Sequence, residues 1–362
     1  MTDPIAGLIE QIGKASTALR PLRIRGGGTK DFYGQPTADE VLDTRGHAGI
    51  VTYEPTELVI TARAGTPLAE VEAALAEHAQ LLPFEPPHFG GGATIGGAVA
   101  AGLSGPRRAA VNGYYGAVRD FVLGAKLIDG RGDLLTFGGQ VMKNVAGYDV
   151  SRMLAGSMGT LGVITEVSLK VLPAPVATRT LQLSIRDPAQ LIEKLNTWGG
   201  MPLPMTATAW HDGDLGIRLE GAQAAVESAC RKLGGDAVDA DQAERFWRGV
   251  RDHTDPFFSG ATPLWRISVP STTIPLALPG KQFIEWGGAL RWLASDAPAA
   301  VIRKAALQAG GHATLFRAAD DLRREAGVFA PLGTVLARIH KNLKAAFDPH
   351  GVFNPGRMYP DL

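Results

Sequence analysis

Three glycine-rich stretches decide the fold of this 362-residue chain: 25-RGGGTK-30, 90-GGGATIGG-97 and 156-GSMGTLG-162. Each stretch adjoins an apolar run, so its glycines mark the ends of strands and the starts of helices rather than a disordered linker. Turns of this kind let main-chain N–H groups approach a phosphate closely. A purely structural role in tight turns would explain any one stretch, but three of them beside strands favour a cofactor-binding cradle.

These glycines do not form the commonest nucleotide-binding motifs. A dinucleotide-binding Rossmann turn needs G-x-G-x-x-G between a strand and a helix, and the chain holds no complete copy. The P-loop pattern that ends in Gly-Lys-Ser or Gly-Lys-Thr is also missing. We therefore expect a cradle of another type.

The composition excludes several classes of function. With 36 basic and 36 acidic residues, the chain lacks the basic excess typical of nucleic-acid-binding proteins. Its single cysteine, Cys230, allows no internal disulfide and cannot by itself hold a cysteine-ligated iron–sulfur cluster. No window reaches the roughly 18 apolar residues of a transmembrane segment. We expect a cytoplasmic protein that binds no nucleic acid and reaches the inner membrane, if at all, peripherally through partner subunits.

The residues around the first glycine stretch predict alternating helices and strands. The expected elements are a helix over 4–19, strands over 22–25 and 58–63, and a helix with Leu68, Val71 and Leu75 on one face. Thr66 is expected to cap this second helix with its hydroxyl, because Pro67 suits the first helical position and Glu70 the first turn.

The following segment predicts a helix, a hairpin and a long strand. The expected ranges are a small-residue helix over 96–105, paired strands over 118–128 and 134–139, and a strand over 163–173. Asp129-Gly130-Arg131-Gly132 between the paired strands is typical of a hairpin turn. In the last strand, Ile164, Glu166, Ser168 and Lys170 alternate with apolar residues, which predicts one buried and one wetter face.

The second half of the chain predicts a separate antiparallel sheet. Short strands over 181–185, 215–220 and 264–269 alternate with helices that begin near Pro188, Ala222 and Pro298. A final helix over 332–347 precedes the tail. We expect an α+β protein with a cofactor-binding domain over 1–175, a smaller antiparallel-sheet cap domain over 176–330, and a C-terminal helix and tail over 331–362 that return to the first domain.

The order of the motifs resembles one flavoprotein family. RGGGTK (25–30), ATIGGAVAAGLSG (93–105), YGAVRDFVLGAKLIDGRG (115–132) and GYDVSRMLAGSMGTLGVITEVSLKVLP (147–173) resemble the two-subdomain FAD-binding domain of the vanillyl-alcohol-oxidase and p-cresol-methylhydroxylase (PCMH) type. The tail FDPHGVFNPGR (347–357) is similar to the C-terminal segment of the glycolate and D-lactate branch of that superfamily. The resemblance implies FAD as the cofactor.

The resemblance also implies which residues contact FAD. The pyrophosphate would be wrapped by Gly26, Gly27, Gly28, Thr29 and Lys30. The flavin ring and ribityl chain would be lined by Thr94, Gly96, Gly97, Gly102, Ser104 and Gly105, and the ribityl or phosphate edge followed by Gly116, Val118 and Arg119. The adenosine end would be held by Gly159, Thr160, Gly162, Val163 and Ile164. Arg119 with Asp120 could equally form a surface ion pair.

The attachment of the flavin is expected to be non-covalent. Some relatives link FAD through a histidine that follows the first glycine stretch, but this chain has Thr29 there. His88 lies near a second attachment region of other relatives, yet its setting between Pro87 and Phe89 reads as an ordinary loop.

The substrate site is the least defined part of the sequence. Catalytic relatives commonly hold a divalent metal through clustered histidines and a glutamate, whereas the eight histidines here are scattered, so we expect no metal. Arg266 and Arg291, each beside a tryptophan, are candidates for a clamp on a substrate carboxylate, although both could instead pack at a domain surface. Trp286 and Trp292 are more typical of core or interface anchors.

The C-terminal segment offers one further candidate. Asn354 could reach the flavin or simply cap the chain end. Lys341 and Lys344, on the helix before it, are expected to face solvent.

Within the glycolate and D-lactate branch, 141–164, 264–270 and 284–293 resemble the family of FAD-binding E subunits of glycolate oxidase. That implies an FAD-dependent 2-hydroxy-acid dehydrogenase subunit whose complex oxidises glycolate to glyoxylate, with a second flavin subunit and an iron–sulfur subunit as partners. Two alternatives stay open: a self-sufficient flavin oxidase or dehydrogenase acting on a 2-hydroxy acid or an alcohol, and an assembly subunit whose FAD is structural.

Overall fold

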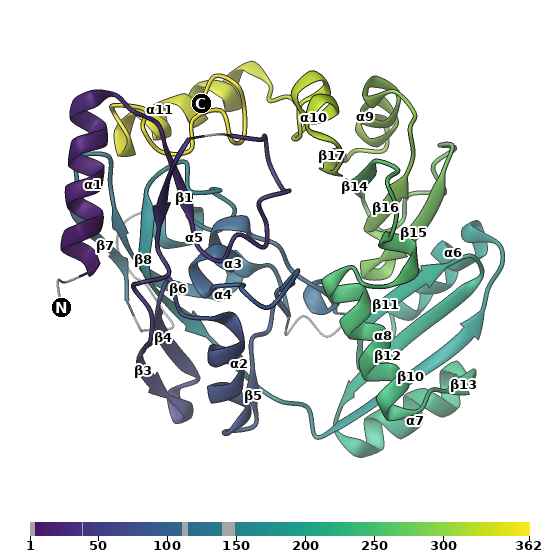
Figure 1. The fold of residues 1–362 in the computed structure, drawn as a ribbon. Helices are drawn as coiled ribbons and strands as arrows, with labels where there is room; N and C mark the ends of the chain where they lie inside the picture. Colours follow the sequence, from purple (N-terminus) through teal and green to yellow (C-terminus); the bar gives the residue numbers. More distant parts are fainter. Residues whose placement is uncertain (1–3, 38, 111–114, 140–148) are drawn as a thin grey trace.

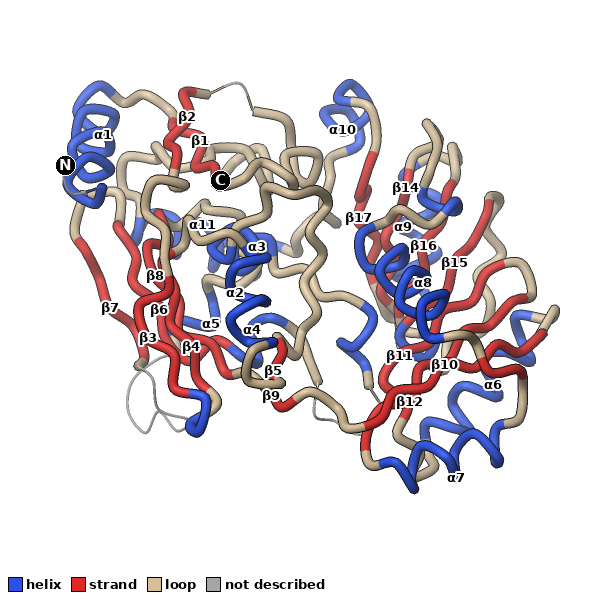
Figure 2. The backbone as a smooth tube through the Cα atoms, turned by 60° about the horizontal axis from the view of Figure 1, so that its bottom comes forward, coloured by secondary structure: helices blue, strands red, loops and turns tan. Residues whose placement is uncertain are grey.

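The computed structural model describes residues 4–37, 39–110, 115–139 and 149–362. Part of the motif quoted above, residues 141–148, therefore lies outside the described residues. Figure 1 shows two sheets on opposite sides of the molecule, and Figure 2 shows helices α2 to α5 between them. We call the elements up to β9, together with α11 and the tail, the N-terminal half, and residues 177–326 the cap.

The N-terminal half is built on a five-stranded antiparallel sheet in the order β3-β4-β8-β6-β7. Its strands are β3 (Ile50–Glu54), β4 (Val59–Arg63), β8 (Val163–Lys170), β6 (Val122–Ile128) and β7 (Leu134–Gly138), with the 3₁₀ helix η1 (Pro55–Glu57) between β3 and β4. The helices α2 (Leu68–Ala76) and α3 (Ile95–Ala101) pack their apolar residues, such as Leu75 and Val99, against Ile60, Leu127 and Val167 of this sheet. The remaining short elements are η2 (Pro106–Ala109), α4 (Val118–Phe121), α5 (Val150–Met153), and the strand pair β5 (Gln80–Leu81) and β9 (Leu172–Pro173).

A second layer of the N-terminal half brings the two ends of the chain together. The strands β1 (Leu22–Arg25) and β2 (Glu40–Asp43) pair in parallel, and α1 (Pro4–Ala18) packs Leu8 and Ile12 on the same cluster as β1. After α11 (Thr334–Phe347) the tail pairs with β1: Leu22 N–H donates to the Val352 carbonyl at 2.7 Å, and Asn354 N–H donates to the Leu22 carbonyl at 2.9 Å. The C-terminal tail thus returns to the strand that leads into the first glycine stretch.

The cap contains an eight-stranded antiparallel sheet in the order β13-β10-β12-β11-β15-β16-β14-β17. Its strands are β10 (Ala177–Ser184), β11 (Met205–His211), β12 (Asp214–Gly221), β13 (Asp236–Ala237), β14 (Leu264–Ser268), β15 (Lys281–Glu285), β16 (Leu290–Ala294) and β17 (His312–Arg317). Its helices are α6 (Pro188–Gly199), α7 (Gln223–Leu233), α8 (Ala240–Asp252), α9 (Ala299–Gln308) and α10 (Asp320–Ala326), with the 3₁₀ helices η3 (Pro256–Phe258) and η4 (Trp286–Gly288). The two faces of this sheet pack against different elements. Residues of α6, α7 and α9 cover one face.

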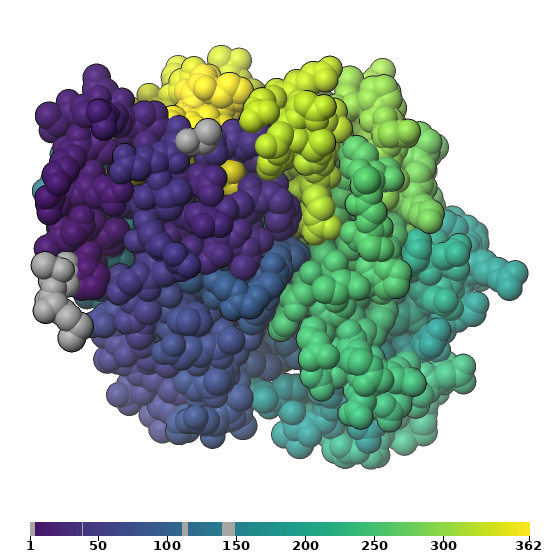
Figure 3. Space-filling view, in the orientation of Figure 1, coloured from purple at the N-terminus to yellow at the C-terminus, as the bar shows by residue number. Residues whose placement is uncertain are grey.

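The other face of the cap sheet packs against the N-terminal half. An aromatic cluster there joins Phe283, Trp286 and Trp292 of the cap to Tyr33 and Met158 of the N-terminal half. Figure 3 shows the two halves in contact along this seam. Burying large aromatic side chains removes much apolar area from water, so the seam is a dry interior rather than a loose contact.

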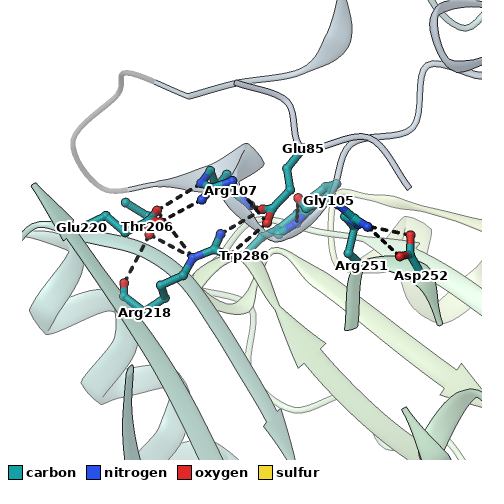
Figure 4. A network of polar contacts seen from close by, with 9 residues as sticks. All are labelled: Glu85, Gly105, Arg107, Thr206, Arg218, Glu220, Arg251, Asp252 and Trp286. Atoms are coloured by element: carbon teal, nitrogen blue, oxygen red, sulfur yellow. Dashed lines mark hydrogen bonds and ion pairs between the residues drawn. The ribbon is translucent and has the colours of Figure 1, made fainter. Parts of the chain in front are cut away.

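A ring of four buried charges also crosses the seam (Figure 4). The Glu85 carboxylate accepts hydrogen bonds from both Arg218 Nη atoms at 2.9 and 2.8 Å and lies 3.3 Å from Arg107 Nη1. Arg107 in turn donates to both oxygens of Glu220 at 3.0 and 2.8 Å. Because Glu85 and Arg107 belong to the N-terminal half and the other two residues to the cap, the ring fixes one half on the other.

The sequence predicted the α+β class and the antiparallel second sheet correctly, but some local details differ. Thr66 does not cap α2; its hydroxyl instead accepts from Gly49 N–H at 2.9 Å and donates to the Arg63 carbonyl at 2.6 Å. Residues 118–121 form the short helix α4 rather than strand, because the Asp120 carboxylate accepts a hydrogen bond from Ala117 N–H at 2.8 Å. The small-residue helix begins at Ile95 and ends before Gly102, whose φ of +63° stops it.

The prediction of a wetter face on β8 was also wrong in part. Glu166 and Lys170 are partly exposed, but Ile164 and Ser168 are buried. Ser168 tolerates burial because its hydroxyl is hydrogen-bonded to that of Thr61 on β4, at 2.8 Å. The hairpin between β6 and β7 is as predicted, with Asp129 N–H donating to the Asp133 carbonyl at 3.0 Å.

Candidate functional site

A cavity opens where the first glycine stretch, the start of α3 and the C-terminal tail meet. The predicted residues that line it are Gly26, Gly27, Gly28, Thr29, Lys30, Thr94, Gly97 and Asn354. The lining residues that the sequence reasoning missed are Arg23, Ile24, Arg25, Asp31, Ala100, Ala101, Met158 and Arg357. Residues more than 300 positions apart in the chain therefore share one wall.

The glycines form this cavity by allowing two stretches of main chain to touch. A Cβ atom on Gly27 would lie 1.4 Å from the carbonyl oxygen of Gly92, and one on Gly26 would lie 2.4 Å from the Thr94 hydroxyl. Gly28 has a φ of +72°, which glycine adopts without strain. Thr94 caps α3 by accepting a hydrogen bond from Gly97 N–H at 3.2 Å. The first two glycine stretches are thus required for each other's packing, and together they form one wall.

The cavity carries a surplus of positive charge. Among the described residues that line it, Arg23, Arg25, Lys30 and Arg357 contribute four cationic groups and Asp31 the single carboxylate. The Asp31 carboxylate lies 3.0 Å from Arg23 Nη2 and 2.7 Å from Arg25 Nε. Burial lowers the pKa of Lys30 to about 8 and that of Arg357 to about 10. A diphosphate would supply the missing negative charge and would raise the pKa of both groups again, because a nearby anion favours the protonated form.

Arg357 and Asn354 hold the walls in place from the tail. Arg357 donates to the carbonyls of Gln35 at 2.7 Å and of Asp31 at 3.1 Å, and so fixes the loop that follows the first glycine stretch. The Asn354 side chain accepts from Ile24 N–H at 2.7 Å and donates to the Met158 carbonyl at 2.6 Å. Asn354 therefore ties β1 to the third glycine stretch, from a position on the cavity wall.

Lys344 contradicts the expectation of a solvent-facing lysine. Its ammonium group is buried and donates to the Thr160 carbonyl at 2.9 Å, to the Phe353 carbonyl at 2.6 Å and to the Asp348 carboxylate at 2.7 Å. Three acceptors compensate the loss of hydration, so the lysine holds the tail against the third glycine stretch. Lys341, by contrast, is exposed and pairs with Asp361.

Several predicted cofactor residues of the second and third glycine stretches pack in the interior rather than on the cavity wall. A Cβ atom on Gly96 would lie 2.5 Å from that of Ala64, and one on Gly105 would lie 2.3 Å from the Glu85 carbonyl. Gly102, with its φ of +63°, touches Gly156. The Ser104 hydroxyl is buried and has no hydrogen-bond partner among the described residues, which leaves it able to accept a ligand contact.

The remaining predicted residues lie in two other places. Gly116, Val118 and Arg119 belong to the segment that forms α4. Gly159, Thr160, Gly162, Val163 and Ile164 run from the third glycine stretch into β8, where a Cβ on Gly162 would lie 2.6 Å from the Ile128 carbonyl and the Thr160 hydroxyl donates to the Ser157 carbonyl. Close packing against neighbouring protein atoms thus accounts for the glycine at position 162 without a contact to a cofactor.

The two arginine candidates of the cap lie on opposite faces of its sheet. In the pairing of β14 with β16, Arg266 lies opposite Trp292 and Arg291 lies opposite Ile267, one position along. Arg266 lies over the indole of Trp286, 5.1 Å from the ring centre. Arg291 is buried and donates to the carbonyls of Gly288 and Thr273 at 2.7 and 2.6 Å. The structure therefore does not bring the two together into one clamp.

Two further expectations concern side chains at the seam and in the loop before the second glycine stretch. Trp286 and Trp292 are both 4% exposed and lie in the aromatic cluster, as expected for interface anchors. His88 donates its main-chain N–H to Asp252, and its ring lies 2.9 Å from Glu72. Both His88 contacts hold the loop.

Among the described residues, no group of three or more histidine, cysteine or acidic side chains is arranged to hold a metal ion. Within the same residues, none of the helices combines the length and apolarity that crossing a bilayer requires.

Comparisons with known proteins agree with this geometry. Residues 6–138 match a family model described as an FAD binding domain. The glycolate oxidase subunit GlcE of Escherichia coli (strain K12) is 51% identical over 355 residues, which cover 98% of this chain and 97% of that protein. The glycolate oxidase subunit GlcD of Bacillus subtilis (strain 168) is 26% identical over 74% of this chain and 68% of its own length. A solved alkyldihydroxyacetonephosphate synthase superposes with a TM-score of 0.63, at 14% identity, over 97% of this chain and 74% of that one.

The fold and the cationic, glycine-walled cavity define a flavoprotein with an FAD-binding domain. The glycine cradle and the surplus of cationic groups on its wall fit that cofactor. The chain is 51% identical to the glycolate oxidase subunit GlcE over almost the full length of both proteins, and it therefore belongs to the family of that subunit. The family and the cofactor predicted from the order of the motifs are thereby confirmed.

Proposed function

We propose that this chain is the FAD-binding subunit of a glycolate-oxidising dehydrogenase complex. The complex would convert glycolate to glyoxylate and pass the electrons through flavin to an iron–sulfur subunit, with a second flavin subunit as a further partner. The observation that carries the proposal is the 51% identity to a glycolate oxidase subunit over almost the whole of both chains. D-lactate and D-2-hydroxyglutarate dehydrogenases among the weaker relatives support a 2-hydroxy acid as the substrate class.

The proposed cofactor site is the cavity described above. The loop from Gly26 to Lys30, with Arg23, Arg25 and Arg357 around it, would bind the pyrophosphate through main-chain N–H groups and positive charge. The residues predicted for the flavin ring, the ribityl chain and the adenosine stay part of this proposal. Bound FAD would supply an acceptor for the two electrons that leave the substrate carbon. Attachment would be non-covalent, because Thr29 stands where some relatives carry the linking histidine.

The protein's own residues would orient the substrate and exclude water. The aromatic cluster at the seam, with Phe32 and Phe89 in edge contact at 5.3 Å, keeps the region beside the cavity dry. The single cysteine, Cys230, supports an iron–sulfur cluster on another subunit, because a cluster needs several thiolates. The lack of a metal-binding group among the described residues supports a division of labour in which another subunit contributes to the oxidation of glycolate.

Anaerobic addition of glycolate tests the proposal. We expect the flavin of this chain to bleach when the chain is co-purified with its partner subunits and glycolate is added. Bleaching of the isolated chain at the same rate would instead support the self-sufficient dehydrogenase. A flavin that stays oxidised in an active complex would support the structural role and contradict the proposal.

A further inference from the structure

Two arginines from different parts of the chain hold the loop that follows the first glycine stretch. Arg357, in the tail, donates to four carbonyls of this loop, those of Lys30 (3.3 Å), Asp31 (3.1 Å), Tyr33 and Gln35 (2.7 Å). Arg323, on α10 of the cap, donates to the carbonyls that alternate with these, those of Phe32 at 2.5 Å and Gly34 at 2.8 Å. The consecutive carbonyls of residues 30–35 thus all accept hydrogen bonds from two guanidinium groups.

The same loop joins the cofactor cavity to the cap through its side chains. Lys30 and Asp31 line the cavity. The next two residues, Phe32 and Tyr33, pack on the buried ring of Phe316, with ring centres 5.4 and 5.2 Å apart. Phe316 lies near the end of β17, the strand that precedes α10. One part of the cap therefore contacts both the side chains and the main chain of a loop that also forms the cavity wall.

The loop depends on the two arginines because it has no regular secondary structure. Residues 26–35 belong to no helix or strand, and Tyr33, Gly34 and Gln35 are buried. Buried carbonyls without a partner are destabilising, and here the guanidinium groups supply the donors that a helix or sheet would supply. The main-chain N–H groups of residues 26–30 have no acceptor among the described residues, so they remain available for a phosphate.

Arg323 is held in position from its own side of the seam. Its side chain is buried, and its second Nη atom donates to the Asp320 carboxylate, in the first turn of the same helix, at 2.5 Å. Arg323 does not line the cavity, whereas Arg357 does. Any influence of Arg323 on a bound cofactor must therefore pass through the loop.

We infer that Arg323 is a positioning residue of the FAD site, which holds the phosphate-binding loop through the Phe32 and Gly34 carbonyls and so makes the affinity for FAD depend on the docking of the cap. The coupling is reciprocal: FAD that stabilises this conformation of the loop stabilises the contact with α10 by the same free energy. The inference rests on the cofactor site that is part of the proposed function.

Titration of the chain with FAD, followed by flavin fluorescence at pH 7, tests the first half of this inference. Arg323→Met should weaken FAD binding about tenfold, which is the lower end of what a charge-assisted hydrogen bond contributes. Arg323→Lys keeps the charge but not the planar fork that reaches two carbonyls, so it should restore part of the affinity. An arginine that only joined the two halves would lower the urea midpoint of the chain without FAD and leave the dissociation constant of the folded chain unchanged.

The matched control is Arg324→Met, which removes the same charge from the next position of α10, where the side chain is exposed. Its affinity for FAD should stay within about twofold of that of the unsubstituted chain, as is typical of surface substitutions. Urea unfolding without FAD should show each variant folded before the titration.

Hydrogen–deuterium exchange with and without FAD tests the reciprocal half. In the unsubstituted chain and in Arg324→Met, FAD should slow amide exchange both in residues 26–35 and in α10. In Arg323→Met the protection should persist in the loop and disappear from α10.

The outcomes separate this inference from the proposed function. Unchanged FAD affinity in folded Arg323→Met, or protection confined to the loop in the unsubstituted chain, would overturn the inference and leave the proposed function intact. A chain that takes up no FAD would contradict the proposed cofactor site, and with it the positioning role of Arg323.

Discussion

Replacing Glu85 by Gln removes one negative charge from the four-membered ring that joins the two halves. The carboxylate accepts hydrogen bonds from both Arg218 Nη atoms at 2.9 and 2.8 Å and from Arg107 N–H at 2.9 Å. Its side chain is only 10% exposed, so water cannot take over these bonds. Gln has the same shape but carries an NH₂ group that must point at one of the two arginines. The substitution thus leaves two buried positive charges with one carboxylate, Glu220.

The size of the effect follows from the pKa of Glu85. Burial alone would raise this pKa, but Arg107 and Arg218 outweigh burial and lower it from 4.5 to about 2. A difference of this size corresponds to about 3 kcal/mol of stabilisation. A carboxyl group with a lowered pKa in the folded state contributes its full stabilisation above the unfolded pKa near 4.5 and loses it as the pH falls towards 2. Glu85→Gln should therefore cost about 3 kcal/mol at pH 7 and much less at pH 3.

Urea unfolding followed by tryptophan fluorescence at pH 7, 5 and 3 measures this difference. The unsubstituted chain should lose stability steeply below pH 5, and Glu85→Gln should follow a flatter curve that approaches it at pH 3. Glu244→Gln is the matched control, because Glu244 is 74% exposed in its pair with Arg248 and should leave the curve unchanged. Parallel curves for Glu85→Gln and the unsubstituted chain would refute the reasoning.

Three further predictions concern the cavity and the seam. Burial lowers the pKa of Lys30 to about 8, so the affinity for FAD, measured by flavin fluorescence, should fall above pH 8 by up to about tenfold per pH unit. Lys30→Met should bind FAD more weakly at pH 7, and its affinity should not change over this pH range. Burial raises the pKa of Glu285 from 4.5 to about 8. The contribution of this group to folding stability is therefore fully present below pH 4.5 and is lost progressively as the pH rises to 8. Glu285→Gln should raise the urea midpoint at pH 8 and leave it unchanged at pH 4. Asn354→Ala leaves Ile24 N–H and the Met158 carbonyl without their partner and should cost about 2–4 kcal/mol in the same urea assay, whereas an unchanged midpoint would mean that water replaces the amide.

The sequence located the cavity but not the reason for each glycine in it. The first two glycine stretches were expected to bind the cofactor, and Gly26, Gly27 and Gly28 do line the cavity. Gly96 is just as prominent in the sequence, yet it is required by contact with Ala64, about 30 positions earlier in the chain. A pattern of glycines indicates only that a side chain does not fit at those positions. Which neighbouring atom would collide with a Cβ atom is known only from the folded structure.

The charges missed by the sequence reasoning left weak local signals. Arg23 and Arg25 alternate along β1 just before the first glycine stretch, so they point to the same side of the strand. Arg218 and Glu220 likewise alternate in β12, whose other residues are apolar except for Asp214 at its start. Charges at such positions are unusual without a buried partner. The partner of Arg218, Glu85, is more than 130 positions away and belongs to no motif, and the partner of Glu220 is Arg107, more than 110 positions away. Such long-range pairs cannot be recognised from one sequence alone.

The most direct test of FAD binding in the glycine-walled cavity is the visible spectrum of the purified chain before and after acid precipitation, for the unsubstituted protein and two glycine variants. A Cβ on Gly27 would collide with the Gly92 carbonyl, whereas one on Gly91 meets no atom within 4 Å. The unsubstituted chain and Gly91→Ala should show a flavin spectrum that acid releases into the supernatant, and folded Gly27→Ala should lack it. Fresh unsubstituted protein that carries no flavin and does not take up added FAD would contradict the account.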